Sequence, residues 1–306
     1  MGRDKMQGVR NTNKVMETTY LINKINTAFK LEDVLNVENF KEEFNQIMFK
    51  IHPDKCSLTG AADATFKMNG WKNIYENGKI YKDDAGEFKT NGYWLEIKSG
   101  EKNLDWSIDN YKLFQGLKSD TDKHFFKYLP KECKLLSDGI YRYTFLNRAI
   151  PLSGLELPQE HVNWVLNRLL EYCSYLSKIG FVHCGLTPES VFITPENHGI
   201  QIVSWYHLTR INNKIGTVSG KYKNWYPARV FSDKVATPDI DIECSKRIAA
   251  YLLGDKSGNG GKFRKTHNAD FINFLLSHSD SSYKTLLQYK ELLDKNFKKE
   301  FYLLNI

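Results

Sequence analysis

The stretch "GFVHCGLTPESVFITPENHGIQIVSW" (residues 180–205) joins a long helical pattern to a short alternating one through a polar turn. Before it, "PQEHVNWVLNRLLEYCSYLSKIG" (residues 158–180) has apolar residues at helical spacing and ends on a glycine, which favours a helix C-terminus there. After the turn, apolar and polar residues alternate as in a short hairpin. The sequence therefore predicts a helix, a polar loop and a hairpin in succession.

This order resembles the catalytic-loop region of protein kinases, in which His-Arg-Asp-Leu-Lys-Pro-Glu-Asn precedes Asp-Phe-Gly. "YPARVF" (residues 226–231) is similar to the Ala-Pro-Glu end of a kinase activation segment. In "DIDIECSKRIAAYLLG" (residues 239–254), Asp241 stands where the family's central helix has its structural aspartate. The resemblance implies a kinase-like fold in which Asp241 braces the backbone near His183, both with structural roles. The matching loop positions are His183, Leu186, Pro188 and Glu189.

Three positions that carry the chemistry in that family hold different residues here. Gly185 replaces the catalytic aspartate, Ser190 the metal-binding asparagine, and Ser204 the aspartate of Asp-Phe-Gly. Phosphoryl transfer needs a carboxylate near the substrate hydroxyl and anionic ligands for magnesium. A glycine and two hydroxyls supply neither. We therefore expect a pseudokinase, with no catalytic residue, no metal and no required cofactor.

The resemblance offers one candidate for nucleotide binding. Lys98 stands where the family has the strand lysine that contacts the α- and β-phosphates. However, "KDDAGEFKTNG" (residues 82–92) lacks the glycine-rich pattern that covers the phosphates. On the following helix, where a glutamate partner is usual, the sequence has only Asp105, Asp109 and Asn110. Metal-free nucleotide binding at Lys98 stays open.

Two other functions compete with this reading. The first is an atypical active kinase in which Asp105, Asp239 or Asp241 replaces the missing carboxylates. The second is a viral or parasite protein that inhibits or mimics a host chaperone or kinase. The abundance of lysine, asparagine, tyrosine and phenylalanine fits an AT-rich genome, which is a compositional indication only.

A second motif lies in the N-terminal quarter of the chain. "FKIHPDKCS" (residues 49–57) contains His52-Pro53-Asp54-Lys55 between two helical patterns, residues 39–51 and 62–78. A proline stop explains the end of the first helix by itself. The second pattern places Phe66, Met68, Trp71, Ile74 and Tyr75 on one predicted apolar face.

A polar tetrapeptide between two antiparallel helices resembles the J-domain of the DnaJ family, over residues 28–78. In that family, the His-Pro-Asp loop contacts a DnaK-type (heat-shock seventy class) chaperone and stimulates its ATPase. The resemblance thus implies chaperone binding by His52, Pro53 and Asp54, with Lys41 and Lys50 on the basic face. That face is thin, because acidic residues stand between the two lysines. A hairpin that only packs against the rest of the chain is the alternative.

Length and composition fit a chain with two folded domains. The 306 residues are 41% hydrophobic and carry a formal net charge of +7, spread along the chain without a base-reading motif, so nucleic-acid binding is not expected. The odd number of cysteines, without a C-x-x-C pair, argues against disulfides and zinc and favours a cytoplasmic location. We expect no membrane span. The cysteines are Cys56, Cys133, Cys173, Cys184 and Cys244.

The predicted fold class is α+β: a helical J-domain hairpin, then a bilobal kinase-like fold with a small β-rich lobe and a larger helical lobe. Strand patterns occupy residues 79–100 and 131–146, the latter with a turn at Ser137-Asp138-Gly139, and a helix pattern lies at residues 107–118. The expected parts are a flexible tail (1–14), a J-domain-like unit (15–78), a kinase-like N-lobe (79–150) and a kinase-like C-lobe (151–306). The expected role is a non-enzymatic adaptor that recruits a chaperone and binds an unknown client or partner protein.

Overall fold

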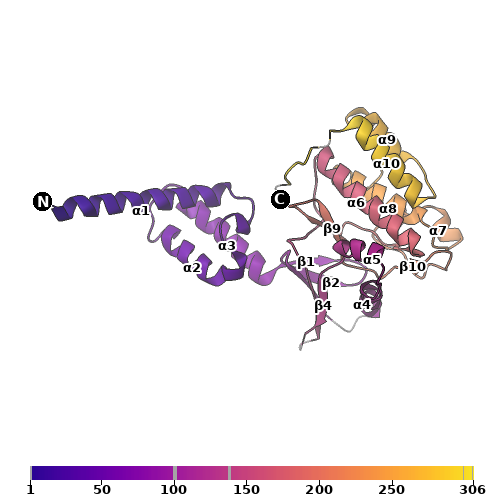
Figure 1. The fold of residues 1–306 in the computed structure, drawn as a ribbon, viewed down its shortest axis with the longest axis horizontal. Coiled ribbons are helices and arrows are strands. Elements are labelled where there is room, and N and C mark those ends of the chain that lie inside the picture. The colour runs from indigo at the N-terminus through magenta and orange to yellow at the C-terminus, as the bar shows by residue number, and fades with distance from the viewer. Residues whose placement is uncertain (1, 99–101, 137–138, 299, 305) are drawn as a thin grey trace. The chain divides into compact units, whose positions relative to one another are not determined.

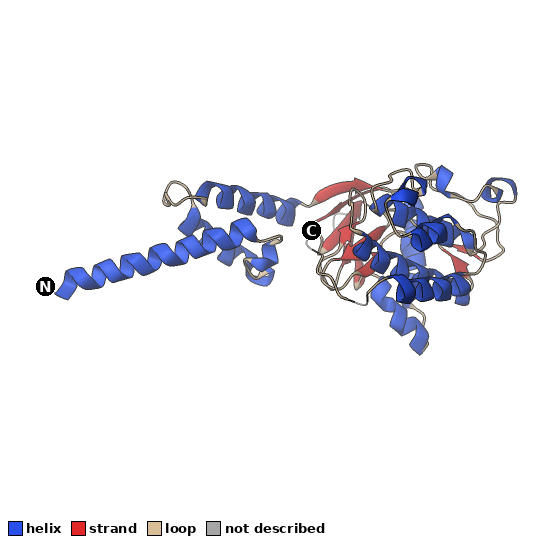
Figure 2. Cartoon of the chain, turned by 90° about the horizontal axis from the view of Figure 1, so that it is seen from above, coloured by secondary structure: helices blue, strands red, loops and turns tan. Residues whose placement is uncertain are grey.

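The structure is a computed structural model that describes residues 2–98, 102–136, 139–298, 300–304 and 306, with the backbone alone at residues 2–14, 38 and 102. The chain forms two compact units, residues 1–79 with 305–306 and residues 80–304. The division lies one residue from the predicted boundary after residue 78. Strands begin at Lys79, and the described residues before it form helices and loops (Figure 2).

The N-terminal unit is built from three helices, drawn in indigo to purple in Figure 1. They are α1 (Gly2–Thr27), α2 (Phe40–Ile51) and α3 (Ala61–Asn77), with short 3-10 turns η1 (Leu31–Asp33) and η2 (Val37–Asn39) between α1 and α2. The flexible tail expected at residues 1–14 is instead helical from Gly2. The segment contains no proline, so the hydrogen-bond ladder of α1 continues through it.

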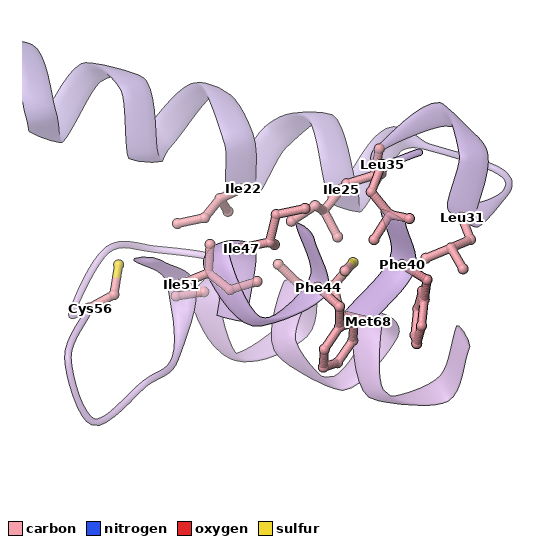
Figure 3. Close-up of a cluster of buried hydrophobic side chains, with 13 residues drawn as sticks. Ile22, Ile25, Leu31, Leu35, Phe40, Phe44, Ile47, Ile51, Cys56 and Met68 are labelled. Atoms are coloured by element: carbon pink, nitrogen blue, oxygen red, sulfur yellow. The ribbon is translucent and has the colours of Figure 1, made fainter. Parts of the chain in front are cut away.

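The core of this unit lies between the three helices (Figure 3). The sequence predicts one apolar face of α2, and this face is confirmed because all four of its residues are buried: Phe40, Phe44, Ile47 and Ile51. The face predicted for α3 needs correction, since Phe66 is 83% exposed while Met68 is fully buried. The buried stripe of α3 runs through Ala61, Ala64, Thr65 and Met68, which turns Phe66 outward. The buried set is Ile22, Ile25, Leu31, Val34, Leu35, Phe40, Phe44, Ile47, Ile51, Cys56, Ala61, Ala64 and Met68.

The second unit begins with a five-stranded sheet in the order β1-β2-β3-β5-β4. The strands are β1 (Lys79–Lys82), β2 (Glu87–Thr90), β3 (Trp94–Lys98), β4 (Glu132–Leu135) and β5 (Ile140–Thr144). Helices α4 (Lys102–Gln115) and α5 (Asp120–Phe125) and the turn η3 (Phe126–Tyr128) connect β3 to β4. The predicted strand regions and the helix between them are thus present. Of the predicted turn, Ser137 and Asp138 lie outside the described residues.

The rest of this unit is mainly helical (Figure 1). The long helices α6 (Gln159–Lys178), α8 (Asp239–Leu252) and α10 (Ser282–Asn296) pack together, and α9 (Ala269–Leu276) adjoins α8 and α10. Short strands hold the loops between them: β6 (Ile150–Pro151) with β8 (Val191–Thr194) and β9 (Gly199–Ile202), and β7 (Phe181–Val182) with β10 (Thr209–Arg210). The remaining elements are η4 (Lys223–Trp225), α7 (Arg229–Ser232) and η5 (Gly261–Lys265).

The structure is thus a mixed α+β fold, as the sequence predicted. A helix, a polar loop and the β8–β9 hairpin follow one another at residues 158–205, which was the expected order. All five cysteines are free. In the part of the chain that is described, every helix is too short or too polar to cross a bilayer.

Candidate functional site

The polar loop after β7 is fixed to helix α8 by one carboxylate. The amide N–H of His183 donates to Asp241 Oδ2 at 2.7 Å, and the amide N–H of Cys184 donates to Asp241 Oδ1 at 2.9 Å. Asp241 is 2% exposed, and burial raises the pKa of its carboxyl to about 7 against the lowering effect of the two amides. These are the hydrogen bonds that the sequence led us to expect of Asp241.

The carboxylate also stabilises an unusual backbone conformation in this loop. Cys184 has φ of 58°, in the left-handed region that side chains other than glycine rarely adopt. His183 beside it is 1% exposed, and burial together with the nearby His207 lowers its pKa to about 3. The His183 ring is therefore neutral at physiological pH, which suits a structural role and not acid–base catalysis.

Gly185 lies directly against the ring of His207. A Cβ atom at position 185 would lie 2.4 Å from His207 Cδ2 and 3.0 Å from His207 Cβ, closer than atoms can approach. The space that an aspartate side chain at 185 would need is therefore occupied. His207 is 6% exposed, so the ring is part of the packed interior.

Ser190 braces the same loop from within. Its hydroxyl donates to the carbonyl of Gly185 at 3.1 Å, and it accepts from the amide of Thr187 at 2.9 Å. Ser190 is 2% exposed, so this hydroxyl is committed to the loop backbone. Ser190 thus helps to hold the loop together.

Ser204 contacts the turn between β1 and β2. Its hydroxyl donates to the carboxyl of Asp83, and burial raises the pKa of Asp83 to about 6. In the same turn, Asp84 Oδ2 lies 3.2 Å from His207 Nε2, and His207 Nδ1 lies 2.8 Å from Thr217 Oγ1. The structure thus places one carboxyl of this turn, that of Asp83, on Ser204, and the other, that of Asp84, on the His207 ring that packs against Gly185.

Asp83, Asp84 and His207 were missed by the sequence reasoning. Asp84 and His207 are 123 residues apart, and no spacing rule links them. One signal was available. A glycine at position 185 points to a close neighbour, because glycine is the residue that permits such an approach.

Lys98 lies at the exposed end of β3. On the same strand, Glu96 forms an ion pair with Arg142 of β5. Among the described residues, Lys98 forms no ion pair with an acidic side chain, and no hydrogen bond links its side chain to Gly185 or Ser204. This placement fits an exposed strand lysine.

The three carboxylates considered as replacements have other surroundings. Asp105 is exposed on α4. Asp239 is 3% exposed and is paired with Arg229, while its carboxylate also accepts from the hydroxyl of Thr237 at 2.5 Å. Asp241 is bound to the loop amides. In the described structure, none of them contacts Ser190 or Ser204.

A buried glutamate ties the same loop to the segment that follows it. Glu189, 3% exposed, accepts from Lys221 Nζ at 2.6 Å, from the Tyr222 hydroxyl at 3.0 Å and from the Ser153 hydroxyl at 3.0 Å. A buried carboxylate with three donors fixes the surrounding backbone. Glu189 thus holds the polar loop against the segment that contains Lys221 and Tyr222.

In the N-terminal unit, the tetrapeptide follows α2 directly. The amide of His52 closes the helix on the carbonyl of Met48 at 3.0 Å, and His52 Nδ1 lies 3.5 Å from Asp54 Oδ2. The side chains of His52 and Asp54 are 44% and 84% exposed. Pro53 is exposed as well. These three residues can therefore be contacted from outside.

The two lysines of the expected basic face, Lys41 and Lys50, are exposed on α2. Glu42 and Glu43 line the same helix surface, with Glu43 accepting from the amide of Asn36 at 2.8 Å. The surface carries mixed charge, so long-range attraction of an acidic partner is weak.

Comparisons with known proteins find similar folds among solved structures and no match elsewhere. No protein-family model matches the chain, and no curated protein matches it. The solved structure described as "Structure of vaccinia related kinase 3" covers 72% of this chain and 92% of its own, with 12% identity and a TM-score of 0.46. A TM-score below 0.5 does not establish the family of this chain.

Proposed function

We propose that this chain is a non-enzymatic adaptor. Its N-terminal unit recruits a DnaK-type chaperone through His52, Pro53 and Asp54. Its second unit is a pseudokinase that binds a client or partner protein and transfers no phosphate. The observation that supports the pseudokinase part of this proposal is the pair of hydrogen bonds from the amides of His183 and Cys184 to Asp241.

These bonds support the kinase-like alignment at the point where it matters most. The expected partner of the loop lies 57 and 58 residues along the chain, on a different helix, and it makes both bonds. With the loop in that register, Gly185, Ser190 and Ser204 stand where the family has charged or amide ligands. Removing a single group that stabilises the transition state typically costs about 3 kcal/mol. Losing three leaves no useful turnover.

The active-kinase alternative gains no support from the candidate replacements. Asp239 is neutralised by Arg229, and Asp241 is committed to the loop backbone. Asp105 is exposed on α4. A magnesium ion requires several oxygen ligands at one point, and these carboxylates are engaged elsewhere or exposed.

The proposal that the N-terminal unit recruits a chaperone rests on the position of the tetrapeptide His52-Pro53-Asp54-Lys55. The α2–α3 hairpin presents His52 and Asp54 at its closed end, with side chains that a partner can reach. The ring of Phe49, 66% exposed, lies under Lys55 Nζ at 3.8 Å from its centroid, next to the same loop. An exposed aromatic ring beside polar groups is a common composition for a protein contact.

The test is single-turnover ATP hydrolysis by a DnaK-type chaperone in the presence of the full chain. We expect the wild type to accelerate hydrolysis, and His52→Gln to lose at least about tenfold of this acceleration, as expected for a contact residue. The matched control is His278→Gln, a histidine that is 66% exposed in the second unit. Equal acceleration by His52→Gln and His278→Gln, or none by the wild type, would refute chaperone recruitment.

A further inference from the structure

The turn between β1 and β2, Asp83–Gly86, folds into the second unit and is not a projecting loop. The amide of Asp83 donates to the carbonyl of Gly86 at 3.0 Å. Asp83 Oδ1 accepts from the amides of Ala85 and Gly86 at 2.8 and 3.1 Å. Ala85 at its tip is 1% exposed. We call these four residues the plug turn.

The plug turn contacts three separate segments. Asp83 accepts from the hydroxyl of Ser204, after β9. The carboxyl of Asp84 lies on His207 at 3.2 Å and also binds the Ser219 hydroxyl and the Gly220 amide. The carbonyl of Asp84 accepts from Asn103 Nδ2 of α4 at 3.2 Å. A four-residue turn with this many polar partners and a buried tip has one preferred position.

Both ring nitrogens of His207 have a polar partner, Asp84 at Nε2 and Thr217 at Nδ1. Its Nδ1 lies 2.8 Å from Thr217 Oγ1, and its ring occupies the space beside Gly185. Asp84, His207 and Thr217 therefore form a continuous polar chain across the region. One end of that chain is accessible, because the Asp84 side chain is 30% exposed while that of His207 is 5% exposed.

We propose that the plug turn is an intramolecular stopper, which occupies the phosphate side of the nucleotide cleft and is held there by the Asp84–His207 contact. The proposal rests on the proposed function, since the kinase-like alignment defines the cleft. Ser204 donates to the carboxyl of Asp83, and Ala85 at the tip of the turn is 1% exposed, so the turn itself packs into the space beside Ser204. In this proposal the turn closes the phosphate side of the cleft, and releasing Asp84 is the step that opens it.

The experiment is residue-resolved amide hydrogen exchange on the full chain, with no nucleotide present. Asp84→Asn removes the charge at the His207 contact with little change in shape. Glu87→Gln, an exposed carboxylate at the start of β2, is the matched control. We expect the amides of Ala85 and Gly86 to exchange at least about tenfold faster in Asp84→Asn, because a lost charged hydrogen bond increases local opening by that factor. These amides bind Asp83 and not Asp84, so they report on movement of the whole turn.

In the same spectra, the amides of His183 and Cys184 report on the fold of the unit, because they bind Asp241. The proposal predicts that they exchange at unchanged rates. Unchanged exchange at Ala85 and Gly86, or equal acceleration in Glu87→Gln, would overturn it. Faster exchange at His183 and Cys184 as well would also overturn it, since the contact would then stabilise the fold and not the turn. Magnesium-ATP binding tests the pseudokinase function separately, because the exchange measurement contains no nucleotide.

Discussion

At the scale of single residues, the most consequential group is the buried carboxylate of Asp241. It is 2% exposed and makes two short hydrogen bonds to the amides of His183 and Cys184, of which Cys184 has a left-handed backbone. Without the carboxylate, two buried donors would lose their partners in a loop that already carries conformational strain. The shape of the whole polar loop therefore depends on one side chain.

Asp241→Ala is expected to lower the free energy of unfolding of the second unit by roughly 1 to 3 kcal/mol, the cost of unpaired buried amides. The measurement is urea denaturation, with Asp280→Ala as the control because Asp280 is exposed in the loop before α10. If the two variants unfolded at the same urea concentration, Asp241 would not hold the loop as described.

The carboxyl of Asp83 predicts a dependence of stability on pH. Burial raises its pKa from 3.8 to about 6, so the folded state binds this proton more tightly than the unfolded state does. The protonated Asp83 carboxyl contributes fully to the free energy of unfolding below pH 4. This contribution decreases as the pH rises towards 6 and is lost above pH 6. Asp83→Asn, which keeps the shape and stays neutral, should therefore gain on the order of 3 kcal/mol relative to wild type between pH 4 and pH 7.

This comparison is made by measuring melting temperatures of both proteins across the same pH range. Asp83 has Asp84, Ser204 and the amides of Ala85 and Gly86 as its polar neighbours. Those groups are common to both proteins, so the difference isolates Asp83. A constant difference between pH 4 and pH 7 would show that the Asp83 carboxyl is not buried as the structure has it.

At the scale of elements, the important contact is between the polar loop and the segment after β9. Gly185 and His207 fit together only because position 185 has no side chain, since a Cβ there would lie 2.4 Å from the ring. The same packing holds His207 where it meets Asp84. The polar loop at Gly185, the segment at His207 and the turn at Asp84 thus pack on one another, so the effects of substitutions in them on stability are coupled.

Gly185→Ala should destabilise the second unit by about 1 to 3 kcal/mol, the usual cost of overpacking. Adding His207→Ala should remove most of that penalty, because it vacates the space that the new methyl group needs. Denaturation of the wild type, both single variants and the double variant gives the coupling free energy. Simple additivity of the two single effects would mean that the two residues do not pack as described.

The sequence predicted elements better than it predicted contacts between them. The α2 face, the strand regions and the bonds of Asp241 followed from periodicity and from a resemblance that kept register over many residues. Phe66 was misplaced because Phe66 and Met68 lie only two residues apart, so they cannot share one helix face, and periodicity alone does not choose between them. The Asp84–His207 contact could not be predicted, because only the folded chain brings together residues that are 123 positions apart.

At the scale of the whole molecule, the chain consists of two compact units with different tasks in our proposal. The first presents an exposed His52 and Asp54 at the end of a helical hairpin. The second has a buried framework around Asp241 and Glu189, and the Ser190 hydroxyl is bonded to the loop backbone. In our proposal the exposed tetrapeptide of the first unit contacts a partner, while the buried loop of the second unit has a structural role.

The most direct test of the pseudokinase is a thermal-shift titration of the full chain with ATP, with and without magnesium, combined with radiolabelled phosphate incorporation. A ligand at 100 times its dissociation constant stabilises a protein by about 2.7 kcal/mol, which raises the melting temperature by several degrees. Because Gly185, Ser190 and Ser204 offer magnesium no anionic ligand, we expect no magnesium-dependent shift and no incorporated label. A magnesium-dependent rise in melting temperature, or label incorporation that Lys98→Ala abolishes, would contradict the account and identify an active kinase.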